Sequence, residues 1–77
     1  MRTIKDIHAN DDWTLTVTFA DGTQRVFDVK PLLGCEAFSP LRDPEQFRAI
    51  HNRGYFIAWD CEADLSADTL FHEGTVH

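Results

Sequence analysis

The stretch WTLTVTFADGTQRVFDV, residues 13–29, decides the fold. In its first half every second residue is large and apolar, namely Trp13, Leu15, Val17 and Phe19. The residues between them are threonines, and this period of two is typical of a strand with one buried face. A second strand-like run, QRVFDV, follows the turn residues ADGT. The stretch therefore predicts an antiparallel hairpin.

The register of this hairpin follows from the length of its loop. A two-residue loop at the Asp-Gly pair would set Leu15 opposite Asp28 and mix apolar with polar side chains on each face. A three-residue loop, residues 20–22, sets Leu15 opposite Phe27 and keeps one face apolar. It also places Gly22 at the left-handed position of a type I turn with a bulge, where glycine is least strained. We predict the three-residue loop.

Two further segments are expected to be strands. Arg2–His8, with Ile4 and Ile7 as its apolar members, fits a short edge strand. Tyr55–Trp59 is apolar on both of its alternating faces, which is typical of a strand that is central in a sheet or covered by a helix. The residues before it, His51–Gly54, are expected to form a turn.

Short helices are predicted from capping residues and prolines. Asp43 stands directly before a proline and predicts a helix over Pro44–Ile50. Ser66 is expected to cap a last short helix, Ala67–His72. Pro31–Gly34 is expected to form a single helical turn that ends at the glycine.

The length and composition fit one small α+β domain. The 77 residues are 43% hydrophobic and 12% aromatic, which is enough for one core and leaves little surplus for a deep ligand pocket. We expect a single domain over residues 1–77, with no linker or targeting segment. Its fold is predicted as a small antiparallel sheet of about four strands, with the hairpin Trp13–Val29 at its centre, packed with two or three short helices.

The net charge of −6 is concentrated towards the C-terminus. Met1–Trp59 carries seven basic and eight acidic residues, which is 7 − 8 = −1, whereas Asp60–His77 carries five acids and no Lys or Arg. Nucleic-acid binding needs clustered cations, so we do not expect it. No apolar run approaches the roughly 20 residues of a membrane span, so we expect no membrane partner either. A basic protein partner fits the sign of the charge.

The stretch WDCEADLSADTLF, residues 59–71, concentrates four acids: Asp60, Glu62, Asp64 and Asp68. A calcium loop would need glycine at its sixth position and glutamate at its twelfth, where this chain has Leu65 and Phe71. A catalytic pair of carboxylates needs a partly dry cleft, and these acids have few apolar neighbours. We therefore interpret the stretch as a turn and a capped helix with an acidic, partner-binding surface. We expect no catalytic residue, metal or cofactor.

Cys35 and Cys61 allow one disulfide bond, and the sequence does not say whether the two residues meet. Residues 1–11 lack the apolar segment of a signal peptide. Without export, thiols stay reduced in the cytoplasm. We expect a cytoplasmic protein in which both cysteines are structural or incidental.

An ordered set of motifs covers nearly the whole chain: LTVTF with FADGT, FDVKPLL, SPLRDPEQF and FIAWDCEADLSADTLF. This set resembles the small bacterial domain-of-unknown-function family 2442. The resemblance implies a small α+β fold, shared residues at Asp28, Trp59 and Asp64, and a glycine where this chain has Glu62. It implies no assigned activity. Many members are encoded beside a second small protein, which implies a toxin–antitoxin pairing.

Two functions of different classes follow as hypotheses. The first is a cytoplasmic protein-interaction module, the acidic and antitoxin-like member of a two-protein system, which binds through Asp60, Glu62, Asp64 and Asp68 and an exposed edge strand. The alternative is a metal-dependent or acid–base enzyme that uses loop carboxylates such as Asp28 and Asp64. The simpler interpretation of these two acids is that they cap turns or helix ends. A homodimer that buries Phe56 and Ala58 is compatible with the first hypothesis.

Overall fold

The computed structural model describes residues 2–61 and 63–76. Its elements follow one another in the order β1 (Ile4–Ala9), β2 (Thr14–Phe19), β3 (Gln24–Asp28), η1 (Lys30–Gly34), η2 (Glu36–Arg42), α1 (Pro44–Arg48), β4 (Ile50–Asn52), β5 (Phe56–Trp59), β6 (Asp64–Ser66), α2 (Ala67–Glu73) and β7 (Thr75–Val76). The η labels denote 3-10 helices.

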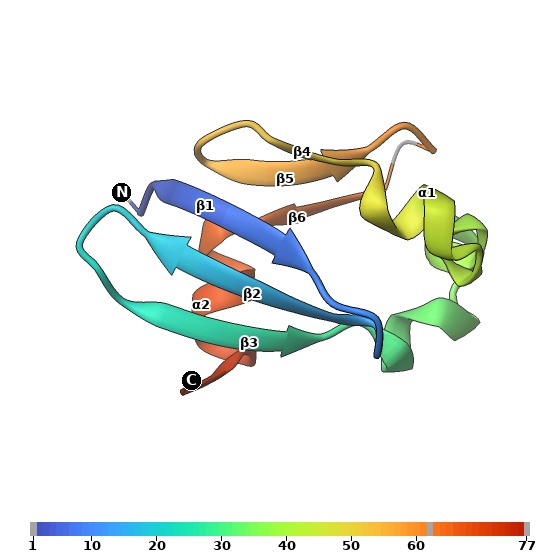
Figure 1. Cartoon of the computed structure of the whole chain (residues 1–77), viewed down its shortest axis with the longest axis horizontal. Helices are drawn as coiled ribbons and strands as arrows, with labels where there is room; N and C mark the ends of the chain where they lie inside the picture. The colour runs from blue at the N-terminus through green and yellow to red at the C-terminus, as the bar shows by residue number, and fades with distance from the viewer. Residues whose placement is uncertain (1, 62, 77) are drawn as a thin grey trace.

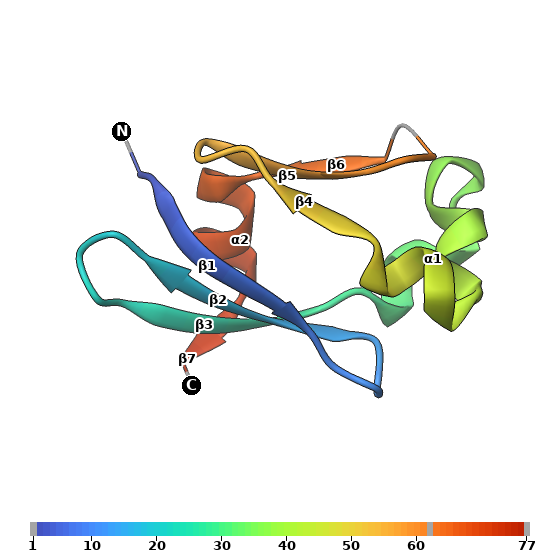
Figure 2. The same cartoon turned by 45° about the horizontal axis from the view of Figure 1, so that its top comes forward.

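The strands form two antiparallel sheets. The strand order is β1-β2-β3-β7 in one sheet and β4-β5-β6 in the other. Helix α2 packs against β3 and β6, while α1 and the 3-10 helices gather at one end of the sheets (Figures 1 and 2). The predicted α+β fold with a four-stranded antiparallel sheet is confirmed, and β1 is an edge strand as expected. The structure adds the three-stranded sheet, in which β5 is the central strand.

Both sheets contribute to one apolar core. Its buried side chains are Ile4, Leu15, Val17, Phe19, Phe27, Val29, Leu41, Phe47, Ile57, Trp59, Ala63, Leu65, Ala67 and Leu70. Within residues 2–61 and 63–76 no polar or charged side chain is buried. The core is therefore held mainly by apolar contact, and the polar and charged residues of the described chain are at least partly exposed.

The register of the central hairpin is the predicted one. Leu15 pairs with Phe27, and the Phe19 N–H donates to the carbonyl of Thr23 at 2.8 Å, which closes a loop of three residues. Gly22 has a φ of 89°, the left-handed conformation expected there. Leu15 and Phe27 are both buried, so the apolar face is on the core side.

The loop between β1 and β2 has the same three-residue form but carries no glycine. The Asn10 N–H donates to the carbonyl of Thr14 at 2.9 Å, so the third loop residue, Trp13, stands where Gly22 stands in the other hairpin. Trp13 has a φ of 62°. For a bulky side chain this conformation costs about 1–3 kcal/mol, so other contacts must hold it.

Those contacts form an aromatic stack of three rings, Trp13, Phe47 and Trp59. The centroids of Trp13 and Phe47 are 6.1 Å apart, and those of Phe47 and Trp59 are 6.2 Å apart. The Trp13 indole N–H donates to the carbonyl of Leu41 at 2.8 Å, and the Trp59 indole N–H donates to the carbonyl of Phe47 at 2.8 Å. The stack joins the loop before β2 to α1 and β5.

The prediction for the middle of the chain was partly wrong. Asp43 caps α1 as predicted, since its carboxylate accepts from the Glu45 N–H at 3.0 Å. The helix ends at Arg48, however, and Ile50 begins β4. Residues 51 and 52, predicted as a turn, pair with β5 instead. The segment is a strand because its backbone pairs with β5, which is a tertiary interaction. The local sequence pattern does not indicate this pairing.

The C-terminal helix confirms the predicted cap. The Ser66 hydroxyl accepts from the Thr69 N–H at 3.1 Å, and α2 begins at the next residue. The sequence pattern missed β6 just before it, because a three-residue strand with Leu65 as its one apolar side chain shows no period.

We predict that glycine at position 13 is less harmful than alanine. Trp13→Gly and Trp13→Ala both lose the stack and the indole hydrogen bond, but glycine also relieves the left-handed strain. Urea unfolding should show Trp13→Gly more stable than Trp13→Ala by roughly 1 kcal/mol. As a control, Thr14→Gly should be less stable than Thr14→Ala, because Thr14 is in a strand. A less stable Trp13→Gly variant would show that the strain is absent.

Candidate functional site

The three-stranded sheet has one buried and one open face. Ile57, Trp59 and Leu65 point to the core and are buried. The side chains that alternate with them point outwards, because side chains of a strand alternate between the two faces. The register aligns His51 with Ala58 and Asp64, and Phe56 with Ser66. We call these five residues, His51, Phe56, Ala58, Asp64 and Ser66, the open sheet face.

Phe56 is the largest apolar side chain of the open sheet face, at the start of β5. It is 40% exposed, and the neighbouring Tyr55 in the turn before β5 is 57% exposed. The central position of this strand was predicted correctly, but its second apolar face is not covered by a helix. An exposed aromatic residue beside polar ones is a common feature of protein-binding surfaces.

Two of the four acids singled out in the sequence lie at this face. Asp64 is exposed on β6. Asp60 is exposed, and its carboxylate lies 2.8 Å from the Nε2 atom of His51. Glu62 lies outside the described residues. The structure thus brings Asp60 and Asp64 to one surface. Asp64 is opposite Ala58 and Asp60 follows the end of β5, so both acids lie on the same side of Phe56 along the strand.

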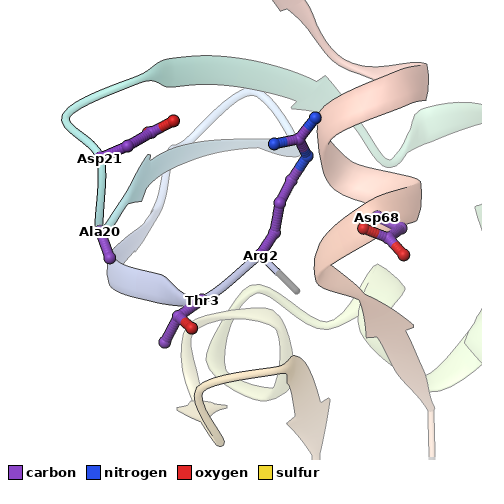
Figure 3. Close-up of a pocket in the computed structure, with 5 residues that line it drawn as sticks. All are labelled: Arg2, Thr3, Ala20, Asp21 and Asp68. Carbon is purple, nitrogen blue, oxygen red and sulfur yellow. The ribbon is translucent and has the colours of Figure 1, made fainter.

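The fourth acid, Asp68, lies in a different place. It lines a shallow groove of about 420 Å³ with Arg2, Thr3, Ala20 and Asp21 (Figure 3). The groove lies between the β2–β3 loop and α2. The Arg2 guanidinium carbon is 3.3 Å from the centre of the Phe71 ring, a cation–π contact that ties the start of the chain to α2.

Asp28 and Trp59, two of the residues that the family resemblance implies are shared, make structural contacts. The Asp28 carboxylate accepts from the Lys30 N–H at 2.9 Å and lies 3.1 Å from the Lys30 ammonium, which is the turn-capping role expected of it. Trp59 is buried in the aromatic stack. Asp28 and Asp64 lie on different surfaces, since Asp64 points to the open sheet face.

Asp28 lies at the rim of a second groove, which we call the β3–α2 groove. Its volume is about 390 Å³, and its lining residues are Phe27, Asp28, Pro31, Leu32, Leu65, Thr69 and Glu73. The floor is apolar and two carboxylates stand at the rim. No sequence pattern indicated this groove, because its residues come from four separate elements.

Within residues 2–61 and 63–76, no three His, Cys, Asp or Glu side chains gather closely enough to hold a metal ion. Cys35 is exposed, Cys61 is partly buried, and both are free thiols. None of the helices described over residues 2–61 and 63–76 is long and apolar enough to cross a membrane.

Comparison with known proteins identifies the family. Residues 4–75 match the family DUF2442, described as a protein of unknown function, and the chain belongs to this family. No curated protein and no solved structure matches the chain. The resemblance inferred from the sequence motifs is confirmed, and the family assigns no activity to the surfaces described above.

We predict a pH-dependent contribution of Asp21 to stability. Hydrogen bonds from the backbone N–H and the hydroxyl of Thr23, together with the charge of Arg2, lower the pKa of Asp21 below its usual value. A lowered pKa stabilises the fold above the carboxyl's unfolded pKa, and this effect is lost as the pH falls through the folded pKa. Thermal unfolding should therefore show Asp21→Ala less stable than wild type at pH 7.

The difference in Tm between wild type and Asp21→Ala should shrink as the pH falls from about 5 to about 2.5. Thr23→Val, which removes the hydroxyl and keeps the backbone donor, should show a smaller change of the same sign. A Tm difference that is equal at both ends of this pH range would contradict the assignment.

Proposed function

We propose that this member of the DUF2442 family is a protein-interaction module that binds a basic partner through the open sheet face. The observation that carries the proposal is the uncovered outer side of β4, β5 and β6, where the exposed Phe56 shares a surface with two exposed carboxylates, Asp60 and Asp64. On the inner side of the same strands, Ile57, Trp59 and Leu65 are buried. A sheet that buries one face and leaves an aromatic residue on the other is suited to docking.

The charge of the chain supports a basic partner. The net charge is −6, and the two acids at the open sheet face are solvent-exposed. Opposite charges on two surfaces speed up encounter and orient it, so the acids select the partner while Phe56 supplies apolar contact. In this proposal the chain is the acidic, antitoxin-like member of a two-protein system, and its free thiols suit a cytoplasmic location.

The acids at the open sheet face can be separated experimentally from the overall charge. We expect wild-type bait to retain a basic protein from native lysate, and Asp60→Asn/Asp64→Asn bait to bind that protein roughly tenfold more weakly at low salt. Glu36→Gln/Glu45→Gln removes the same amount of charge elsewhere and should bind as wild type does. Asp68→Asn should also have little effect, since Asp68 lies in another groove.

Binding should weaken as the salt concentration rises from about 0.05 to 0.5 M, because exposed charges are screened. Equal retention by the Asp60/Asp64 and the Glu36/Glu45 variants would rule out the open sheet face as the electrostatic surface. If no bait retains a partner, sedimentation of wild type and Phe56→Ser tests whether a second copy covers the face instead. A wild-type dimer that Phe56→Ser dissociates would replace the basic partner with the homodimer.

A further inference from the structure

Strand β6 leaves an edge of backbone groups open on the three-stranded sheet. The Trp59 N–H donates to the carbonyl of Ala63 at 2.9 Å, and the Ala67 N–H donates to the carbonyl of Tyr55 at 2.9 Å. In an antiparallel ladder the residues between such pairs direct their N–H and C=O groups to the other side. The N–H and C=O of Asp64 and the N–H of Ser66 therefore point to the outer edge of β6, which ends the sheet, whereas the Ser66 carbonyl belongs to the first turn of α2.

The two sides of this edge carry different side chains. On the outer side, Asp64 and Ser66 belong to the open sheet face. On the inner side, Leu65 lines the β3–α2 groove, whose floor also holds Phe27 and Leu32. A chain that ran along the edge would meet an acidic surface on one side and an apolar groove on the other.

The edge strands of the two described sheets are β1, β7, β4 and β6, and the longest of them, β1, is protected against pairing. Strand β1 carries Lys5 and an irregularity in its register between Ile4 and Asp6, both of which discourage pairing with another strand. The start of β1 is also tied to the end of β4, because the Asn52 side-chain amide donates to the carbonyl of Ile4 at 3.0 Å. Strand β6, with the sequence DLS, has no Lys, Pro or bulge.

We propose that an extended segment of the partner adds to the outer edge of β6 as a fourth strand, with apolar and basic side chains in alternation. The inference rests on the proposed function and specifies the partner segment for the same surface. Alternation follows from strand geometry, because successive side chains of the added strand point to opposite faces. The apolar ones enter the β3–α2 groove, and the basic ones lie beside Asp64 on the open sheet face.

The charges around the groove agree with this occupant. Asp28 and Glu73 are both exposed at its rim; Asp28 is paired with Lys30, so Glu73 is the acid that a basic residue at the end of the segment meets. Glu73 is in the last turn of α2, where a negative charge is unfavourable to the helix dipole. Its position is therefore not explained by helix stability, and it suits a role in binding.

The test uses two peptides of equal composition. The first, acetyl-Lys-Val-Lys-Val-Lys-Val-Lys-amide, alternates basic and apolar residues, and the second has the same residues in blocks, acetyl-Lys-Lys-Val-Val-Val-Lys-Lys-amide. Titrations followed by amide chemical shifts should show the alternating peptide binding at least tenfold more tightly. The largest shifts should occur at Asp64, Leu65 and Ser66. An equal affinity of both peptides, or no binding up to several millimolar, would overturn strand addition.

A pair of variants at Ser66 tests the backbone bond itself. Ser66→Ala removes the helix cap and keeps the N–H, whereas Ser66→Pro removes both, and the φ of −73° at this position accepts proline. We expect Ser66→Pro to bind the alternating peptide about threefold to tenfold more weakly than Ser66→Ala, the loss of one hydrogen bond. Equal affinities would contradict the inference.

Asp60→Asn/Asp64→Asn separates the two proposals. If these substitutions weaken the binding of both peptides equally while the Ser66 variants bind alike, the result supports the acidic binding surface and contradicts strand addition. If the Ser66 variants differ while the Asn substitutions have no effect, the edge binds a strand and the electrostatic part of the proposed function fails.

Discussion

The stack of Trp13, Phe47 and Trp59 is the contact on which the arrangement of the two sheets depends. It links the loop before β2, the helix α1 and the central strand of the second sheet, with ring centroids 6.1 and 6.2 Å apart. Each indole N–H also has a backbone carbonyl partner at 2.8 Å, so the two tryptophans are held by directional bonds and by packing. This explains how Trp13 is kept in a left-handed conformation.

A chain of 77 residues has too few large side chains to cover both faces of two sheets. The four-stranded sheet and α2 cover the inner face of β4, β5 and β6, and the outer face stays open. Phe56 and the carboxylates of Asp60 and Asp64 are exposed for this reason. The surface that we propose for binding is thus a consequence of one core shared by two sheets.

Much of the fold could be predicted from local patterns. The alternation of Trp13 to Phe19 determined the hairpin and its buried face, and the loop length that preserves this face determined the register. Asp43 and Ser66 marked the starts of both α-helices, because short polar side chains satisfy free N–H groups at a helix start. The acidic character of the segment after Trp59 was also evident, although its residues were assigned to one surface.

The tertiary structure alone decided which residues share a surface. It separated Asp68 from Asp60 and Asp64, because α2 begins at Ala67, between Asp64 and Asp68, and the helix directs its side chains to a different side. It made β6 from three residues without a period, since Leu65 pairs with Ile57 of β5. Local sequence determines where strands and helices begin, whereas sheet pairing depends on backbone bonds between distant segments, which side-chain patterns do not specify.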